Sequence, residues 1–266
     1  MAGTRLGGTI IAALVLAGCT LLVDTSGLSG ETADASSPDG STNGDATTDG
    51  GGGGADGTTD PTGEGGDVDA GRTNPPCETD SELKLCLRFE DNTTDESPSN
   101  AAPKASSGLV YEAGRHGKAA KFGAGGSISD LTYASTLFGG AKTIEVWVKP
   151  ASTSRMVVAD VRDDFALLVE GGKVICRQPE LASTASIPLN EWSHVACVTD
   201  LAVMRAYVNG SQSNSAVSTN ATDNNADTGI GQDSPTGGTR FEGSMDDLRI
   251  WTTTRTAPQI MESATR

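Results

Sequence analysis

The sequence predicts an all-β fold, a two-sheet antiparallel sandwich of the jelly-roll type, confined to residues 77–266. Short segments that alternate apolar and polar residues recur at close spacing, Gly and Asn stand where tight turns are expected, and helical periodicity is almost absent. Many short strands joined by such turns are typical of antiparallel sandwiches.

Residues 1–18 have the pattern of an export signal. Arg5 supplies a positive charge, and Thr9 to Ala17 supplies an apolar stretch of suitable length. The run Leu16-Ala17-Gly18-Cys19 resembles the bacterial lipobox, which implies that Cys19 is acylated and becomes the mature N-terminus. Two or three acyl chains anchor a protein stably to a membrane. An uncleaved membrane anchor over residues 6–23 is the alternative, although its glycines make it a poor span.

Residues 19–76 are predicted to form a lipidated, disordered linker. No Phe, Tyr or Trp occurs before Phe89, and no Leu, Ile, Met or Phe lies between Leu28 and Leu83. Too little apolar surface is present to offset the entropy of ordering this Gly-, Asp-, Thr- and Ser-rich segment. Residues 20–76 carry eleven acidic residues and one basic residue, a large share of the net charge of -16. A solvated tether is therefore expected, and nucleic acid is excluded as a partner because it requires a basic face.

The folded region begins after Pro76 with the alternating segment Leu83 to Glu90. Further strands are predicted over Thr143 to Pro150, Phe165 to Glu170, Lys173 to Arg177, Trp192 to Thr199, Val203 to Val208 and Phe241 to Trp251. The pairs Gly171-Gly172 and Asn209-Gly210 predict hairpin turns. Thr256 and Gln259 have the spacing of a capping box that opens a short terminal helix.

These motifs, in this order, resemble the laminin-G-like, concanavalin A-like jelly roll. The resemblance rests on LRFEDNTTDESPSN, GRHGKAAKFG, TIEVWVKP, NEWSHVACVTD, MRAYVNG and GSMDDLRIW, between Cys77 and Glu262. It implies two antiparallel sheets packed face to face, with many relatives binding glycans or serving adhesion and some holding a structural calcium ion.

The four cysteines other than Cys19 can pair in three ways. In the family's strand order the segment containing Cys176 runs antiparallel beside the segment containing Cys197, so the resemblance implies that these two cysteines meet. Cys77 and Cys86 would then close a small N-terminal loop. A zinc site is disfavoured because the spacings match no finger or ribbon.

A calcium site is the carboxylate hypothesis that the resemblance favours. The loop from Glu90 to Asn100 resembles the family's loop after the first strand, and Asp246-Asp247 resembles the acidic pair on its last strand. Because the first and last strands are neighbours in a jelly roll, we expect Asp95 and Asp246, then Asp91 and Asn100, to surround one structural Ca²⁺ ion. A solvated acidic loop, with Asp246 capping a turn, is the alternative.

No catalytic residue is predicted. The acidic runs Asp160 to Asp164 and Glu242 to Asp247 do not match the alternating carboxylates of sandwich glycosidases, which the protein resembles in fold. His116 and His194 are the two histidines of the chain, and no nucleophile motif accompanies them.

No ligand-binding residue is predicted either, because most aromatic residues lie in expected strands. Tyr111, Tyr133, Phe138 and the amides Asn214, Asn220, Asn224, Asn225 and Gln232 remain as candidates, and Ser211 to Gly238 has a loop-like composition. The expected function is a non-catalytic binding module, for a glycan or in adhesion, anchored by lipid in the bacterial cell envelope. Thr20 follows the cysteine at the position where inner-membrane lipoproteins often carry Asp, so the lipobox resemblance favours the outer membrane. The alternative is a structural lipoprotein that contacts envelope proteins.

Overall fold

The computed structural model describes residues 75–177, 180–200, 202–218, 225–234 and 238–266. The chain divides into two units, Met1–Asp60 and Pro61–Arg266, and all described residues belong to the second. The described residues form two antiparallel sheets, one short α-helix and two 3₁₀ turns. The predicted all-β, two-sheet sandwich is confirmed. No helix of the described residues is long and apolar enough to cross a bilayer.

The first half of the sandwich contains short strands and the two 3₁₀ turns. These elements are β1 (Leu83–Leu87), β2 (Ala105–Ser107), β3 (Val110–Ala113), β4 (Lys118–Phe122), η1 (Ala124–Gly126), β5 (Asp130–Tyr133), η2 (Ser135–Leu137), β6 (Thr143–Pro150), β7 (Met156–Val161) and β8 (Phe165–Glu170). The second half contains β9 (Lys173–Arg177), β10 (Leu181–Ala182), β11 (Ser193–Thr199), β12 (Val203–Val208), β13 (Ser211–Val217), β14 (Thr228–Ile230), β15 (Gly243–Trp251) and α1 (Ala257–Thr265).

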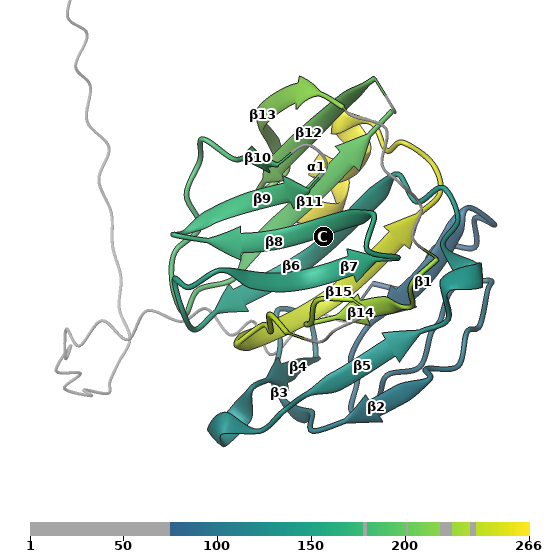
Figure 1. The fold of residues 1–266 in the computed structure, drawn as a ribbon, viewed down its shortest axis with the longest axis vertical. Coiled ribbons are helices and arrows are strands. Elements are labelled where there is room, and N and C mark those ends of the chain that lie inside the picture. The colour runs from purple at the N-terminus through teal and green to yellow at the C-terminus, as the bar shows by residue number, and fades with distance from the viewer. Residues whose placement is uncertain (1–74, 178–179, 201, 219–224, 235–237) are drawn as a thin grey trace, which may run out of the picture. The chain divides into compact units, whose positions relative to one another are not determined.

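The strands form an eight-stranded sheet and a seven-stranded sheet, which Figure 1 shows as overlapping layers. The eight-stranded sheet has the order β13-β12-β11-β6-β15-β4-β3, and β1 also pairs with β15. The seven-stranded sheet has the order β10-β9-β8-β7-β14-β5-β2. Each sheet has an inner face toward the other sheet and an outer face away from it.

Alternation along β6 shows why the sequence forms a sandwich. Ile144, Val146 and Val148 belong to the apolar core between the sheets. The intervening residues Glu145 and Trp147 therefore point to the outer face, because successive side chains of a strand alternate. Both are nevertheless buried, which means that other parts of the chain cover this outer face.

One of these covers is α1. Ile260 of α1 packs in an apolar cluster with Ala196, Val198 and Tyr207 of β11 and β12. The helix begins at the predicted position, where Gln259 Oε1 accepts hydrogen bonds from the backbone N–H and the hydroxyl of Thr256 at 2.8 and 3.0 Å. The predicted hairpin turns are present as well, with left-handed φ angles at Gly171, Gly172, Asn209 and Gly210.

Both disulfides that the resemblance implied are present, Cys77–Cys86 and Cys176–Cys197. The expected location of the second was wrong. Cys176 lies in β9 of the seven-stranded sheet and Cys197 lies in β11 of the eight-stranded sheet, so the bond crosses the core instead of joining neighbours within a sheet. Both side chains point inward, where the two layers pack face to face.

Part of the predicted loop region is also strand. Ser211–Val217 forms β13 at the edge of the eight-stranded sheet, and Thr228–Ile230 forms β14 between β7 and β5. The polar composition of β13 misled the prediction because an edge strand with little buried surface needs few apolar residues.

Candidate functional site

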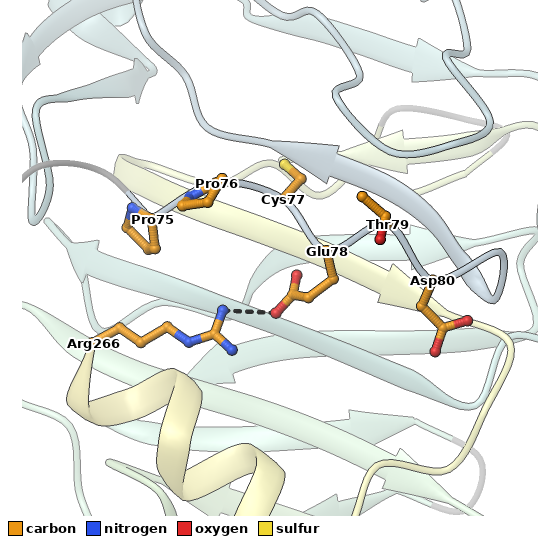
Figure 2. A pocket seen from close by; sticks show the side chains of 7 residues that line it. All are labelled: Pro75, Pro76, Cys77, Glu78, Thr79, Asp80 and Arg266. Carbon is orange, nitrogen blue, oxygen red and sulfur yellow. Dashed lines mark hydrogen bonds and ion pairs between the residues drawn. The ribbon is translucent and has the colours of Figure 1, made fainter.

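A shallow, open pocket of about 620 Å³ lies where the described part of the chain begins. Figure 2 shows that residues 75–80 line one side and that Arg266 faces Glu78 across it. Glu78 Oε1 lies 2.7 Å from Arg266 Nη1, and Glu78 Oε2 lies 3.1 Å from Arg249 Nε. Burial raises the pKa of Glu78, but the two guanidinium groups outweigh it and hold the pKa below its usual value. The pocket lining therefore contains a satisfied ion pair rather than a reactive group.

A buried ionic cluster lies nearby on the outer face of the eight-stranded sheet. Glu145 is fully buried, accepts a hydrogen bond from Trp251 Nε1 at 3.1 Å, and lies 3.5 Å from Arg255 Nε. Burial raises the pKa of Glu145 against the opposing effect of Arg255 and Arg249. Arg255 also donates to Gln259 O and stacks 4.3 Å over the Trp251 ring, so the cluster attaches α1 to the sheet.

His194 belongs to the same face and is a structural residue. Its ring contacts Trp147 edge to face at a centroid distance of 5.5 Å. Burial, together with the charges of Arg249 and Arg255, lowers its pKa to about 3. His194 is therefore neutral at physiological pH. Its Nε2 lies 3.8 Å from Glu145 Oε2, beyond hydrogen-bond distance, which does not suit a catalytic dyad.

Asp95, the first expected calcium ligand, is a backbone cap. Its Oδ1 accepts the N–H groups of Cys86 and Ser97 at 3.0 and 2.9 Å. Its Oδ2 accepts the Ser97 hydroxyl and the Ala101 N–H at 2.9 and 2.8 Å. Four hydrogen bonds occupy the lone pairs of both oxygens, which leaves little capacity for a cation.

Asp246, the second expected ligand, has a different environment. Its Oδ2 accepts the His116 N–H at 2.9 Å, and its buried Oδ1 has no hydrogen-bond partner among the described residues. Burial, followed by the charges of Asp247 and Glu90, raises its pKa to about 8. His116 itself is held by Asp247, whose Oδ2 lies 2.7 Å from its Nδ1. Asp246 thus lies near two other acids, Asp247 and Glu90, whose charges oppose its ionisation.

The remaining expected ligands, Asp91 and Asn100, are exposed turn residues with left-handed φ angles of 56° and 44°. Within the described ranges, no group of three or more His, Cys, Asp or Glu side chains is placed to hold a metal ion. A structural Ca²⁺ ion held by Asp95, Asp246, Asp91 and Asn100 stays a prediction.

The arrangement best suited to binding lies on the outer face of the seven-stranded sheet. We call it the Arg177 cluster, and its members are Asp160, Asp163, Arg177, Asp233 and Ser234. Arg177 Nη2 lies 2.8 Å from Asp160 Oδ2 and 3.2 Å from Asp163 Oδ1, and Nη1 lies 3.5 Å from Asp233 Oδ1. The Ser234 N–H donates to Asp160 Oδ2 at 3.0 Å. Donors and acceptors thus converge from β7, β9 and two loops.

Only part of the Arg177 cluster is open to solvent. The side chains of Asp163, Asp233 and Arg177 are 37%, 28% and 23% exposed, whereas that of Asp160 is fully buried. Burial raises the pKa of Asp160 to about 6 against the opposing contacts from Ser234 and Arg177. Asp160 therefore positions Arg177 from below, and the three partly exposed groups can contact a ligand.

The sheet itself brings these residues together. Asp160 lies beside Ala166 of β8, and Ala166 lies beside Arg177 of β9, in one row across the sheet. Ala166 also packs with Val157, Leu168 and Ile175 in an apolar cluster on this face, and all four side chains are buried.

Sequence reasoning considered Asp163 only as part of the acidic run Asp160 to Asp164, and Asp163 lies in the turn between β7 and β8 with a left-handed φ of 56°. It missed Arg177 and Asp233, which are 56 residues apart. The alternation of Ile175, Cys176 and Arg177 could have indicated which way Arg177 points, but not its partners.

The aromatic residues left as ligand candidates do not form a stacking platform. Tyr133 and Phe138 are fully buried in the core, and Tyr111 packs against it. Phe89, Phe122 and Phe241 lie in the core between the sheets, whereas Trp147 and Trp251 are buried on the outer face. Trp192 is only partly buried. Asn220 and Asn224 lie outside the described residues.

Three solved structures share the fold at low sequence identity. The binding domain of Paraclostridial Mosquitocidal Protein 1 matches with a TM-score of 0.56 and 15% identity over 69% of this chain and 52% of that chain. Domain 4 of AbnA, a GH43 extracellular arabinanase from Geobacillus stearothermophilus in complex with arabinotriose, matches with a TM-score of 0.55 and 20% identity over 69% of this chain and 98% of that chain. The botulinum neurotoxin serotype D binding domain matches with a TM-score of 0.52 and 12% identity over 69% of this chain and 51% of that chain. The match thus spans about half of each toxin domain.

Among curated proteins no sequence matches this chain. A family model does match, from residue 123 to residue 261, which is just over half of the chain. The matched segment contains β6 to β15 and therefore the central strands of both sheets. On this match the chain belongs to the concanavalin A-like lectin/glucanases superfamily.

Proposed function

We propose that the protein is a non-catalytic binding module that recognises a glycan through the Arg177 cluster and is held at the bacterial envelope by lipid on Cys19. The observation that carries the proposal is the convergence of Arg177, Asp163 and Asp233, all partly exposed, on one outer sheet face. A guanidinium group donates up to five hydrogen bonds and carboxylates accept several, which matches the adjacent hydroxyls of a sugar. Family membership and the fold shared with an arabinotriose-binding domain support this choice.

Absence of catalysis is part of the proposal. In the Arg177 cluster each acid contacts the guanidinium group of Arg177. In the acidic run Glu242 to Asp247, Glu242 is exposed and Asp246 is fully buried, so these two carboxylates do not face a common substrate. Paired acid and nucleophile roles need two carboxylates facing one bond across a cleft. Turnover of a β-glucan that disappears in Glu242→Gln would contradict this part.

The binding proposal is tested on a glycan array with the full chain carrying Cys19→Ala, which prevents lipidation. We expect any glycan retained by this protein to be retained at least tenfold less by Arg177→Met and by Asp163→Asn. Arg205→Met is the matched control, because Arg205 is 26% exposed and pairs with Asp200 on the other sheet. Equal retention by Arg177→Met and Arg205→Met would contradict the assigned site.

The anchoring proposal has a separate test. Cells fed a clickable fatty acid should label the chain, and Cys19→Ala should abolish the label and release the protein from the membrane fraction. Unchanged labelling would contradict attachment at Cys19, whereas an unlabelled chain that stays in the membrane fraction would favour the uncleaved anchor over residues 6–23.

A second candidate function is a structural envelope lipoprotein. The observation that favours it is the lack of an exposed aromatic side chain among the described residues, since the large exposed apolar side chains there are Val110, Ile128, Leu189, Val217 and Met261. Blank glycan arrays together with a reproducible crosslink to an envelope protein would support this candidate over glycan recognition.

A further inference from the structure

Residues 77–82, near the start of the described part of the chain, are attached to β15 by non-covalent contacts. Glu78 pairs with Arg249 of β15 and with Arg266. The Thr252 N–H donates to Glu82 O at 2.9 Å, directly after β15. Residues 77–82 thus run along the outer face of the eight-stranded sheet before β1 begins at Leu83.

A covalent bond closes the same segment. Cys77 is bonded to Cys86, and Figure 2 shows the Cys77 side chain pointing away from the pocket lining toward β1. Cys86 is fully buried within β1, directly opposite Arg249 of β15. β15 in turn pairs with β6, and β6 pairs with β11, so Cys86 is linked laterally to the centre of the sheet.

We propose that the Cys77–Cys86 disulfide is a force-bearing clamp, which transfers tension on the upstream linker directly into β1 and shields residues 78–85 from that tension. The clamp rests on the proposed function in one respect. A module that is anchored to the membrane through residues 19–76 and binds an immobile glycan is under tension, and this tension reaches the described domain at Cys77.

The physical reason is the difference between the two kinds of attachment. Glu78 is partly exposed, at 22% of its side chain, and ion pairs that reach solvent are individually weak. Under tension such contacts break one at a time from the end of the segment. Because the disulfide joins Cys77 to a buried residue within the β1–β15 ladder, tension instead acts on several ladder hydrogen bonds together.

The test is single-molecule stretching of the full chain carrying Cys19→Ala, held by an N-terminal tag and by a clickable residue in place of exposed Glu191 before β11. With the disulfide intact we expect smooth stretching of the predicted linker and no discrete step before the whole domain unfolds. Residues 77–82 span about 20 Å when fully extended. Cys77→Ser/Cys86→Ser should therefore show an early step of less than about 20 Å at lower force.

Cys176→Ala/Cys197→Ala is the control, because it removes the other disulfide and leaves the clamp in place. This control should show no early step, even if its final unfolding force falls. If Cys77→Ser/Cys86→Ser does not fold, mild reduction of the parent protein replaces it, since Cys77 is partly exposed whereas Cys176 and Cys197 are fully buried.

A single unfolding step at unchanged force after loss of Cys77–Cys86 would overturn the clamp. That result would leave glycan recognition and lipidation untouched, because neither enters the stretching measurement. Conversely, blank glycan arrays or an unlabelled Cys19 would not alter the early step.

Discussion

Three fully or nearly fully buried aspartates, Asp95, Asp160 and Asp246, show how neighbouring groups set the behaviour of a carboxylate. Asp95 is satisfied by backbone and hydroxyl donors, and Asp160 faces Arg177. Asp246 instead has the acids Asp247 and Glu90 nearby, which add to the effect of burial in raising its pKa to about 8. Asp246 should therefore take up a proton on folding near neutral pH.

Replacing Asp246 should change how stability depends on pH. Its folded pKa of about 8 lies above the unfolded value, so the folded state binds more protons and stability falls as pH rises. Between pH 7 and pH 9 this group should cost the protein about 1.4 kcal/mol, and Asp246→Asn should remove that slope. Urea unfolding of the parent protein and of Asp246→Asn at pH 7 and pH 9 measures this change in the free energy of unfolding.

The control for this experiment is Glu191→Gln on an exposed loop, which should keep the slope of the parent protein. An Asp246→Asn variant that still loses about 1.4 kcal/mol from pH 7 to pH 9 would show that Asp246 is not the source of the slope.

At the scale of elements, α1 depends on a charge buried beneath it. The helix contributes Ile260 to an apolar cluster, and Arg255 just before it reaches Glu145 of β6 and stacks on Trp251 of β15. A nine-residue helix has little stability of its own, so its position depends on these tertiary contacts.

Arg255→Met should destabilise the protein by about 3 kcal/mol, because it leaves Glu145 buried beside fewer cations. Adding Glu145→Gln should restore part of the loss, since the amide keeps the Trp251 hydrogen bond without the charge. Denaturant unfolding of the two single variants and the double variant measures this coupling.

Arg205→Met is the surface comparison, with an expected cost below about 1 kcal/mol because the Arg205–Asp200 pair is partly exposed. Strictly additive losses in Arg255→Met and Glu145→Gln would contradict a direct interaction between the two side chains.

The whole molecule is held as one sandwich partly by Cys176–Cys197, which joins the two layers through the core. This bond closes a loop of 21 residues, and a loop of this size should stabilise the fold by about 3 kcal/mol, chiefly by restricting the unfolded chain.

Cys176→Ala/Cys197→Ala should therefore lower the unfolding free energy by about 3 kcal/mol, with a further loss from the vacated core volume. Cys77→Ser/Cys86→Ser should cost less, because its loop separates residues only nine positions apart. The reverse order in guanidinium unfolding would contradict a main role for the inter-sheet bond.

Local sequence patterns were sufficient for the elements whose chemistry is itself local. Alternation identified β6, β8, β9 and β12 with nearly the observed bounds, Gly171-Gly172 and Asn209-Gly210 identified their turns, and Thr256 with Gln259 identified the start of α1. These features depend on backbone sterics and on side chains a few residues apart, which a linear pattern contains.

The tertiary structure decided what depends on contacts between distant residues. Alternation cannot tell which sheet a strand joins, so Cys176 and Cys197 were expected in one sheet although they bridge two. Likewise, the place of a charged residue in the sequence does not reveal its neighbours, so Arg177 and Asp233 were not expected to meet. Alternation and turn residues thus predicted a two-layer β sandwich, and only the packing of the layers determined which charges are paired, buried or available to a ligand.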